Sequence, residues 1–71
     1  MEKVITRVER MGVSVYGNPY FRLHFDDGTS ARTKIDAMIN YSLTNSENLD
    51  RPASLKLTRA GRVYDIKALE A

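Results

Sequence analysis

The chain has no cysteine, a single histidine, two prolines and no long apolar run. Without cysteine it can form neither a disulfide nor a thiolate metal site, so packing, alone or with self-association, must hold the fold together. No apolar stretch approaches the ~20 residues of a membrane-spanning helix, and we therefore expect no membrane partner. Residues 1–4 lack the basic-then-apolar pattern of a signal peptide, which predicts a cytoplasmic protein.

Groups suited to catalysis are equally scarce. His24 lies in a predicted strand with no nucleophile evident beside it. Asp26 and Asp27 precede Gly28 and are explained by a hairpin turn, which would expose both acids to water. These three side chains alternate faces and offer one nitrogen ligand, and the four glycines are scattered singly. The sequence therefore predicts a protein that is not an enzyme, with no catalytic residue, metal or cofactor.

The 71 residues allow one domain, residues 1–71, of ordinary globular composition. The formal net charge is only +2, but basic residues gather in the C-terminal third. They are Arg51, Lys56, Arg59, Arg62 and Lys67, against Asp65 as the single acid between them. This third could present a positive surface to an anion, although a solvated basic face is the plainer explanation.

Alternation of apolar and polar residues predicts a long first strand over residues 4–16. The valines at its start are one residue out of step with Val13 and Val15, so a strict period of two cannot bury both sets. A bulge near residues 10–12, where Gly12 lies, would restore the phase. We therefore expect a bent first strand.

The next two strands form a predicted hairpin. Residues 20–25 place Phe21, Leu23 and Phe25 on an inner face. Asp27-Gly28 favours a tight turn into a third strand over residues 29–35, with Ala31, Thr33 and Ile35 facing inward.

A short helix is predicted over residues 36–43, with Asp36 as its N-cap. The pairs Met38 with Tyr41 and Ile39 with Leu43 have spacings that share a side of a helix. Polar residues 44–48 form cap and loop, and residues 54–58 and 63–67 then alternate as two more strands around a turn at 59–62.

This order of elements, β-β-β-α-β-β, is mainly β with one short helix and resembles the OB-fold, a small five-stranded, partly open barrel. That resemblance implies a helix between the third and fourth strands and a bent first strand that pairs in both sheets. An SH3-like barrel is the alternative fold, although it usually lacks a helix at this point.

A second resemblance is local. The segments that carry it are Gly17-Asn18-Pro19-Tyr20-Phe21, Asp27-Gly28-Thr29, Ala31-Arg32-Thr33, Asp36-Ala37 and Asn40-Tyr41. They are similar to segments of small uncharacterised proteins encoded by phages and prophages of actinobacteria, over roughly residues 13–66. The resemblance implies a phage or prophage context and brings neither an activity nor a functional residue.

The outward side of the second and third strands is the candidate site. Its residues are Tyr20, Arg22, His24, Arg32 and Lys34, flanked by Arg59 and Arg62 on one side and by Tyr16 and Asn18 on the other. Single-stranded nucleic acid needs flat rings for base stacking and cations along its phosphates. The OB-like resemblance implies oligonucleotide binding on this same face. We therefore expect a small non-catalytic module that binds single-stranded DNA or RNA.

Other functions fit the same pattern. Any antiparallel sheet with one wet face shows this alternation of apolar and polar residues. A phage-encoded protein-interaction module could bind a host protein, or form a homo-oligomer, through an open edge of the first or fifth strand. A structural part of a phage particle is a third possibility.

Overall fold

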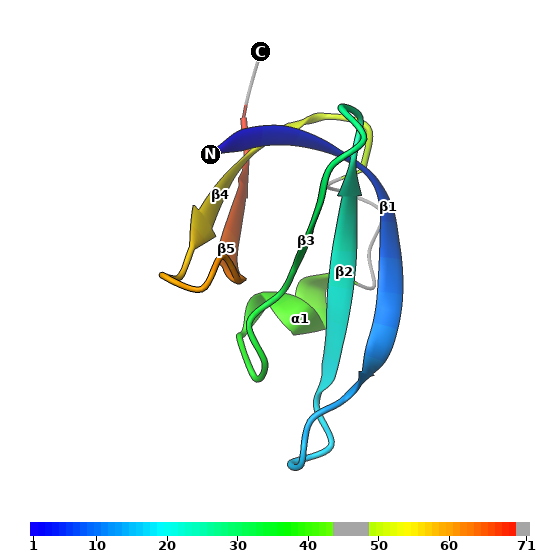
Figure 1. Ribbon diagram of the computed structural model, residues 1–71, viewed down its shortest axis with the longest axis vertical. Coiled ribbons are helices and arrows are strands. Elements are labelled where there is room, and N and C mark those ends of the chain that lie inside the picture. Colours follow the sequence, from blue (N-terminus) through cyan, green and yellow to red (C-terminus); the bar gives the residue numbers. More distant parts are fainter. Residues whose placement is uncertain (44–48, 70–71) are drawn as a thin grey trace.

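A computed structural model describes residues 1–43 and 49–69 of the chain (Figure 1). Its elements are β1 (Glu2–Val13), β2 (Pro19–Phe25), β3 (Ser30–Arg32), α1 (Ile39–Ser42), β4 (Pro52–Leu57) and β5 (Val63–Ala68). The strands pair antiparallel in one sheet of order β3-β2-β1-β4-β5. The predicted order of elements is confirmed: the domain is mainly β with one short helix. The predicted loop at 44–48 lies outside the described residues.

β1 is long and bent because it pairs with two strands in turn. Residues 2–4 pair with β4, whereas residues 5–13 pair with β2 (Figure 1). The register shifts twice, between Ile5 and Arg7 and between Arg10 and Gly12. The second shift confirms the predicted bulge. The reason given for it, that Val13 and Val15 must be buried, is wrong, because Val13 is 53% and Val15 95% exposed.

The first shift explains the β1 side of the core. Ile5 lies opposite Phe25 and Val8 opposite Leu23, although Ile5 and Val8 are three residues apart. The extra residue in this bulge lets both side chains face inward. The buried apolar cluster comprises Ile5, Phe21, Leu23, Phe25, Leu43, Ala53, Leu55 and Val63. The inward alternation predicted for β2 is confirmed, so its polar residues project from the opposite face.

The five strands form a sheet that does not close into a barrel, whereas the sequence predicted a small, partly open five-stranded barrel. β3 and β5 meet only at a parallel bridge between Thr33 and Val63, where the Lys34 amide donates to the Val63 carbonyl at 2.7 Å. Above this bridge the two strands separate in the view of Figure 1. β3 is too short to pair further, because the buried Asn40 donates to the Lys34 carbonyl at 3.0 Å and the chain turns there. Ile35, expected to face inward, is exposed.

The helix begins later than predicted. Met38 is its N-cap and makes no side-chain cap bond, so the capping role predicted for Asp36 is wrong. Asp36 has a φ of 63° and binds the β1–β2 turn instead. Ile39 and Leu43 pack on the core, whereas Met38 is exposed. Among the described residues, no helix is long and apolar enough to cross a membrane.

Candidate nucleic-acid-binding face

The side of the β1–β2–β3 ladders that points away from the core is here called the outer face. It carries Arg7 and Glu9 from β1, Tyr20, Arg22 and His24 from β2, and Ser30 and Arg32 from β3. Strand pairing, not proximity in sequence, brings these side chains together, since successive residues of a strand alternate between faces. Four of the seven predicted site residues lie here: Tyr20, Arg22, His24 and Arg32.

Arg22 and Arg32 lie directly opposite each other on neighbouring strands. Like charges in this position repel and destabilise a sheet. Among the described residues, neither guanidinium takes part in an ion pair. Arg22 Nη1 makes only a long contact of 3.4 Å with Ser30 Oγ, and the buried Arg32 Nε has no hydrogen-bond partner. Glu9, which lies opposite Arg22 on β1, offsets part of this charge without forming an ion pair with Arg22, and an anion would stabilise the positive charge that remains.

Tyr20 lies at the end of the outer face near the β1–β2 turn. Its ring covers Gly12 of β1, where an added Cβ would lie 3.3 Å from the Tyr20 hydroxyl and 3.6 Å from two ring carbons. The guanidinium carbon of Arg32 lies 5.7 Å from the ring centroid, a cation–π arrangement. Gly12 thus lets the ring lie close to the backbone of β1. Tyr20 fixes the position of Arg32 and leaves only part of its own ring for a ligand.

His24 forms a polar cluster with two β1 residues at the end of the outer face near the β2–β3 turn. Its Nε2 lies 2.9 Å from Glu9 Oε1 and 3.1 Å from Arg7 Nη2. The hydrogen bond with His24 is the main cause that lowers the pKa of Glu9, followed by the charge of Arg7. Glu9 therefore stays ionised and offsets part of the positive charge at this end.

Arg7 and Glu9 were absent from the predicted site. Their alternation with Val8 was visible in the sequence, but nothing local indicated which strand would pair with β1. The two residues reach the outer face because residues 5–13 form the neighbour of β2.

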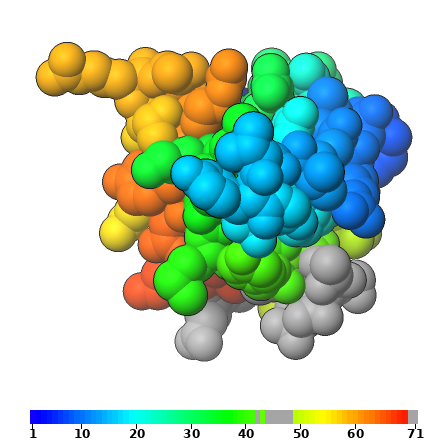
Figure 2. Space-filling model, turned by 90° about the horizontal axis from the view of Figure 1, so that it is seen from below, coloured from blue at the N-terminus to red at the C-terminus, as the bar shows by residue number. Residues whose placement is uncertain are grey.

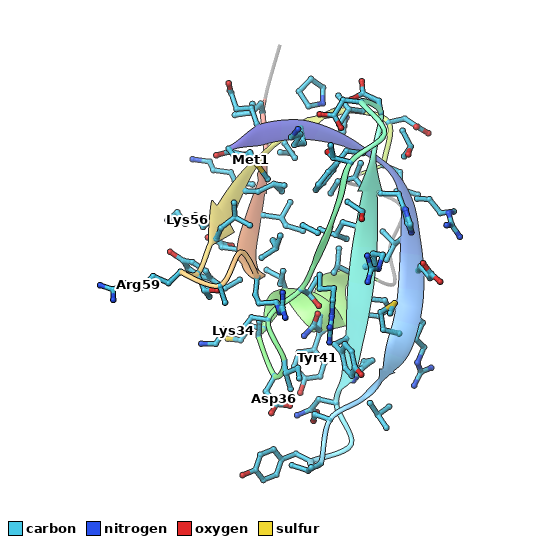
Figure 3. The ribbon with its side chains drawn as sticks, viewed as in Figure 1. Met1, Lys34, Asp36, Tyr41, Lys56 and Arg59 are labelled. Atoms are coloured by element: carbon cyan, nitrogen blue, oxygen red, sulfur yellow. The ribbon has the colours of Figure 1, made fainter. Side chains whose placement is uncertain are left out.

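The remaining predicted residues lie at the margin or beyond it. Lys34 lies at the junction of β3 and β5, where its amide meets Val63, the residue after Arg62. Figure 3 shows Lys34 and Arg59 on the same side of the molecule, with Arg59 extending away from the body. Arg59 belongs to the β4–β5 turn, which protrudes in gold in Figure 2. The structure therefore does not bring Arg59 onto the outer face.

The β1–β2 turn is tied to the segment before α1. Asp36 Oδ1 accepts hydrogen bonds from Ser14 Oγ at 2.7 Å and Asn18 Nδ2 at 2.8 Å, and Tyr41 donates to Asn18 Oδ1 at 2.7 Å. These two donors to its carboxylate lower the pKa of Asp36. The turn and this segment lie side by side in Figure 2. Large apolar side chains are exposed on these two segments and at the ends of the elements beside them: Val13, Val15, Tyr16, Ile35, Met38 and Tyr41.

The turn predicted at Asp26-Asp27-Gly28 is confirmed, and both acids are exposed there. Gly28 has a φ of 85°, and Asp27 accepts from the amide and hydroxyl of Thr29 and forms an ion pair with Lys3. The Lys3 contact is the first cause that lowers the pKa of Asp27. A depression of about 310 Å³ beside this turn is lined by Glu2, Lys3, Val4, Asp26, Asp27, Pro52 and Leu69. Within residues 1–43 and 49–69, no group of three acidic or histidine side chains could hold a metal ion.

No protein-family model matches the chain, and neither a curated protein nor a solved structure is similar to it at a meaningful level.

Proposed function

We propose that the protein is a small non-catalytic module that binds single-stranded nucleic acid on the outer face. The observation that carries the proposal is the opposed pair Arg22 and Arg32, which lies beside Tyr20 and His24. Among the described residues neither arginine forms an ion pair, and Glu9 opposite Arg22 offsets only part of their charge. A sheet that keeps two like charges in register loses stability, and a phosphate between them offsets that loss.

The outer face offers the two chemistries that such a ligand needs. Arg7, Arg22 and Arg32 are cations on three adjacent strands and can follow a phosphate backbone. Rings suited to base stacking lie toward the β1–β2 turn, where Tyr16 is 80% and Tyr41 59% exposed. Tyr16 and Tyr41 are more open than Tyr20, whose ring is partly covered by Arg32 and Gly12. We assign phosphate contacts to the outer face of the sheet and base contacts to its end near the β1–β2 turn.

We also propose that the fold is OB-like. Its support is that β1 pairs with both β2 and β4, that α1 lies between β3 and β4, and that β3 touches β5 through a parallel bridge. The alternative SH3-like arrangement usually lacks a helix at that point.

The test is a titration of fluorescently labelled single-stranded DNA and RNA, followed by anisotropy at low and moderate salt. Binding should weaken steeply with salt, because phosphate contacts release counterions. The variant Arg22→Gln/Arg32→Gln should lose at least about tenfold in affinity and have a salt slope smaller by roughly two.

A charge-matched control separates this face from net charge. Arg10→Gln/Arg51→Gln removes the same two charges, but Arg10 lies opposite Phe21, on the inner side of the ladder, and Arg51 precedes β4. This control should keep most of the affinity. Undetectable binding at low salt, or equal losses in both variants, would refute the proposal.

A second function is favoured by the β1–β2 turn. Exposed apolar clusters of this kind mark protein-interaction surfaces, and here the Asp36 hydrogen bonds hold the cluster in place. In this alternative the exposed apolar cluster at the β1–β2 turn binds a host protein. A nuclease-treated pull-down distinguishes the two functions: a partner lost with Val15→Ser/Met38→Ser, but kept with Arg22→Gln/Arg32→Gln, supports protein binding.

A further inference from the structure

Among the described residues, the edge of β5 that faces away from β4 pairs with another strand only briefly. β5 pairs with β4 over its length, but on its other side Val63 alone meets β3, through Thr33. Beyond Val63, β3 and β5 separate, and no further strand among the described residues lies beside residues 64–68. Such an edge presents unpaired backbone groups that can accept another strand.

The backbone direction at this edge follows from β4. Leu55 exchanges both of its hydrogen bonds with Met1, through Leu55 N to Met1 O at 2.6 Å and Met1 N to Leu55 O at 3.1 Å. Leu55 lies opposite Ile66, so alternation turns the amide and carbonyl of Ile66 away from β4. The Ile66 amide instead meets Asp65 Oδ1 at 3.0 Å. The backbone N–H of Ile66 at this edge therefore donates to a side chain, and the carbonyl of a partner strand could replace that side chain as acceptor.

The charges that flank Ile66 are self-complementary. Asp65 and Lys67 lie one residue on either side of it. If a second β5 pairs antiparallel with Ile66 opposite its own copy, Asp65 of each chain lies opposite Lys67 of the other. Ile66 then forms the hydrogen-bonded pair, and the charged residues occupy the non-hydrogen-bonded positions, where cross-strand side chains are closest.

Both charged groups are accessible for this pairing. Besides the bond from the Ile66 amide, Asp65 has a loose contact of 3.9 Å with Lys56, and both of these side chains are at least half exposed. Lys67 is exposed and has no ion-pair partner among residues 1–43 and 49–69. A shift of register by one residue would lose both attractive pairs.

We infer that the protein forms a two-fold symmetric dimer in which β5 strands of two copies pair antiparallel about Ile66. The occupant is a second copy, because an antiparallel β5 of the same sequence presents its Lys67 to Asp65 and its Asp65 to Lys67. Isologous pairing of this kind closes after two chains. The dimer is independent of nucleic-acid binding, since β5 lies outside the outer face.

Charge reversal at the edge tests the register. Sedimentation velocity from micromolar to millimolar protein should show concentration-dependent dimerisation of the natural chain. Asp65→Lys and Lys67→Asp, taken singly, should each weaken dimerisation by at least about tenfold, because two attractive pairs become repulsive. An equimolar mixture of the two variants should recover association as a heterodimer, which native mass spectrometry resolves.

Two further variants keep the outcome decisive. The double variant Asp65→Lys/Lys67→Asp restores both pairs within one sequence and should dimerise like the natural chain. Arg51→Asp reverses a charge away from β5 and should leave dimerisation unchanged. In the natural chain, the amide resonance of Ile66 should shift with protein concentration. A monomer throughout the concentration range, or single reversals that dimerise normally, would overturn the inference.

Discussion

Arg22 and Arg32 face each other across the β2–β3 ladder, and the guanidinium of Arg32 lies over the ring of Tyr20. The ring holds one cation in place, while no carboxylate among the described residues forms an ion pair with either. We expect this arrangement to lower the stability of the domain and to favour a bound anion. Stability and ligand binding should therefore respond in opposite directions when this repulsion is relieved.

A double-mutant cycle measures the repulsion directly. Either single change, Arg22→Gln or Arg32→Gln, removes the repulsion completely. The second change in the double variant therefore gains no further stability from its removal. We expect the double variant to be less stable than the sum of the single effects predicts, by about 0.2–1 kcal/mol. Urea unfolding at low salt gives this coupling, and added salt should reduce it. A coupling of opposite sign would show that the two cations do not repel.

The Glu9–His24 contact predicts a titration shift. Removing the imidazole in His24→Phe should raise the pKa of Glu9 toward its ordinary value, because the His24 hydrogen bond is the largest cause that lowers it. Carboxyl-detected NMR measures this value. The folded pKa is depressed, so ionised Glu9 contributes stability above its unfolded pKa, and that contribution is lost as the pH falls through the folded pKa. An unchanged Glu9 titration in His24→Phe would contradict the contact.

Asp36 should link acid sensitivity to the β1–β2 turn. Its pKa is lowered by Ser14 and Asn18, so its stabilising effect is present above the unfolded value, about 3.9, and is lost as the pH falls through the folded value. Asp36→Asn can still accept both hydrogen bonds, and should unfold with less dependence on pH in this acidic range. Equal pH dependence of the natural chain and Asp36→Asn would refute the assignment.

The backbone at Asp36 gives a matched comparison. Asp36→Ala and Asp36→Gly both remove the carboxylate, but glycine adopts the φ of 63° without the steric cost that a Cβ brings. Both variants should speed amide hydrogen exchange in residues 14–18, and Asp36→Gly should be the more stable of the two. Slower exchange than in the natural chain would contradict the tie between the two loops.

The core should be sensitive at β2 and tolerant at the β1–β2 turn. Leu23 is fully buried, and Leu23→Ala should cost about 2–5 kcal/mol of unfolding free energy. Val15 is 95% exposed, and Val15→Ala should change stability by less than about 0.5 kcal/mol. Chemical denaturation measures both. Similar effects at the two positions would show that the inner face of β2 is not the core.

The sequence by itself determined the features that depend on neighbouring residues. The order of elements followed from local periodicity and turn residues, and the β2–β3 turn from the positive φ that Gly28 accepts. The alternation of Phe21, Leu23 and Phe25 with polar residues set the two faces of β2. Such patterns are visible without a partner strand, because they reflect backbone geometry over a few residues.

The tertiary structure alone decided the features that depend on pairing across the chain. The bulge between Ile5 and Arg7 puts Ile5 in the core and Arg7 and Glu9 on the outer face. Asp36 binds residues about twenty positions earlier instead of capping α1. The sheet does not close into a barrel, because β3 ends before it can follow β5. Each outcome depends on contacts between distant segments, and a one-residue change of register reverses the face on which every later side chain lies.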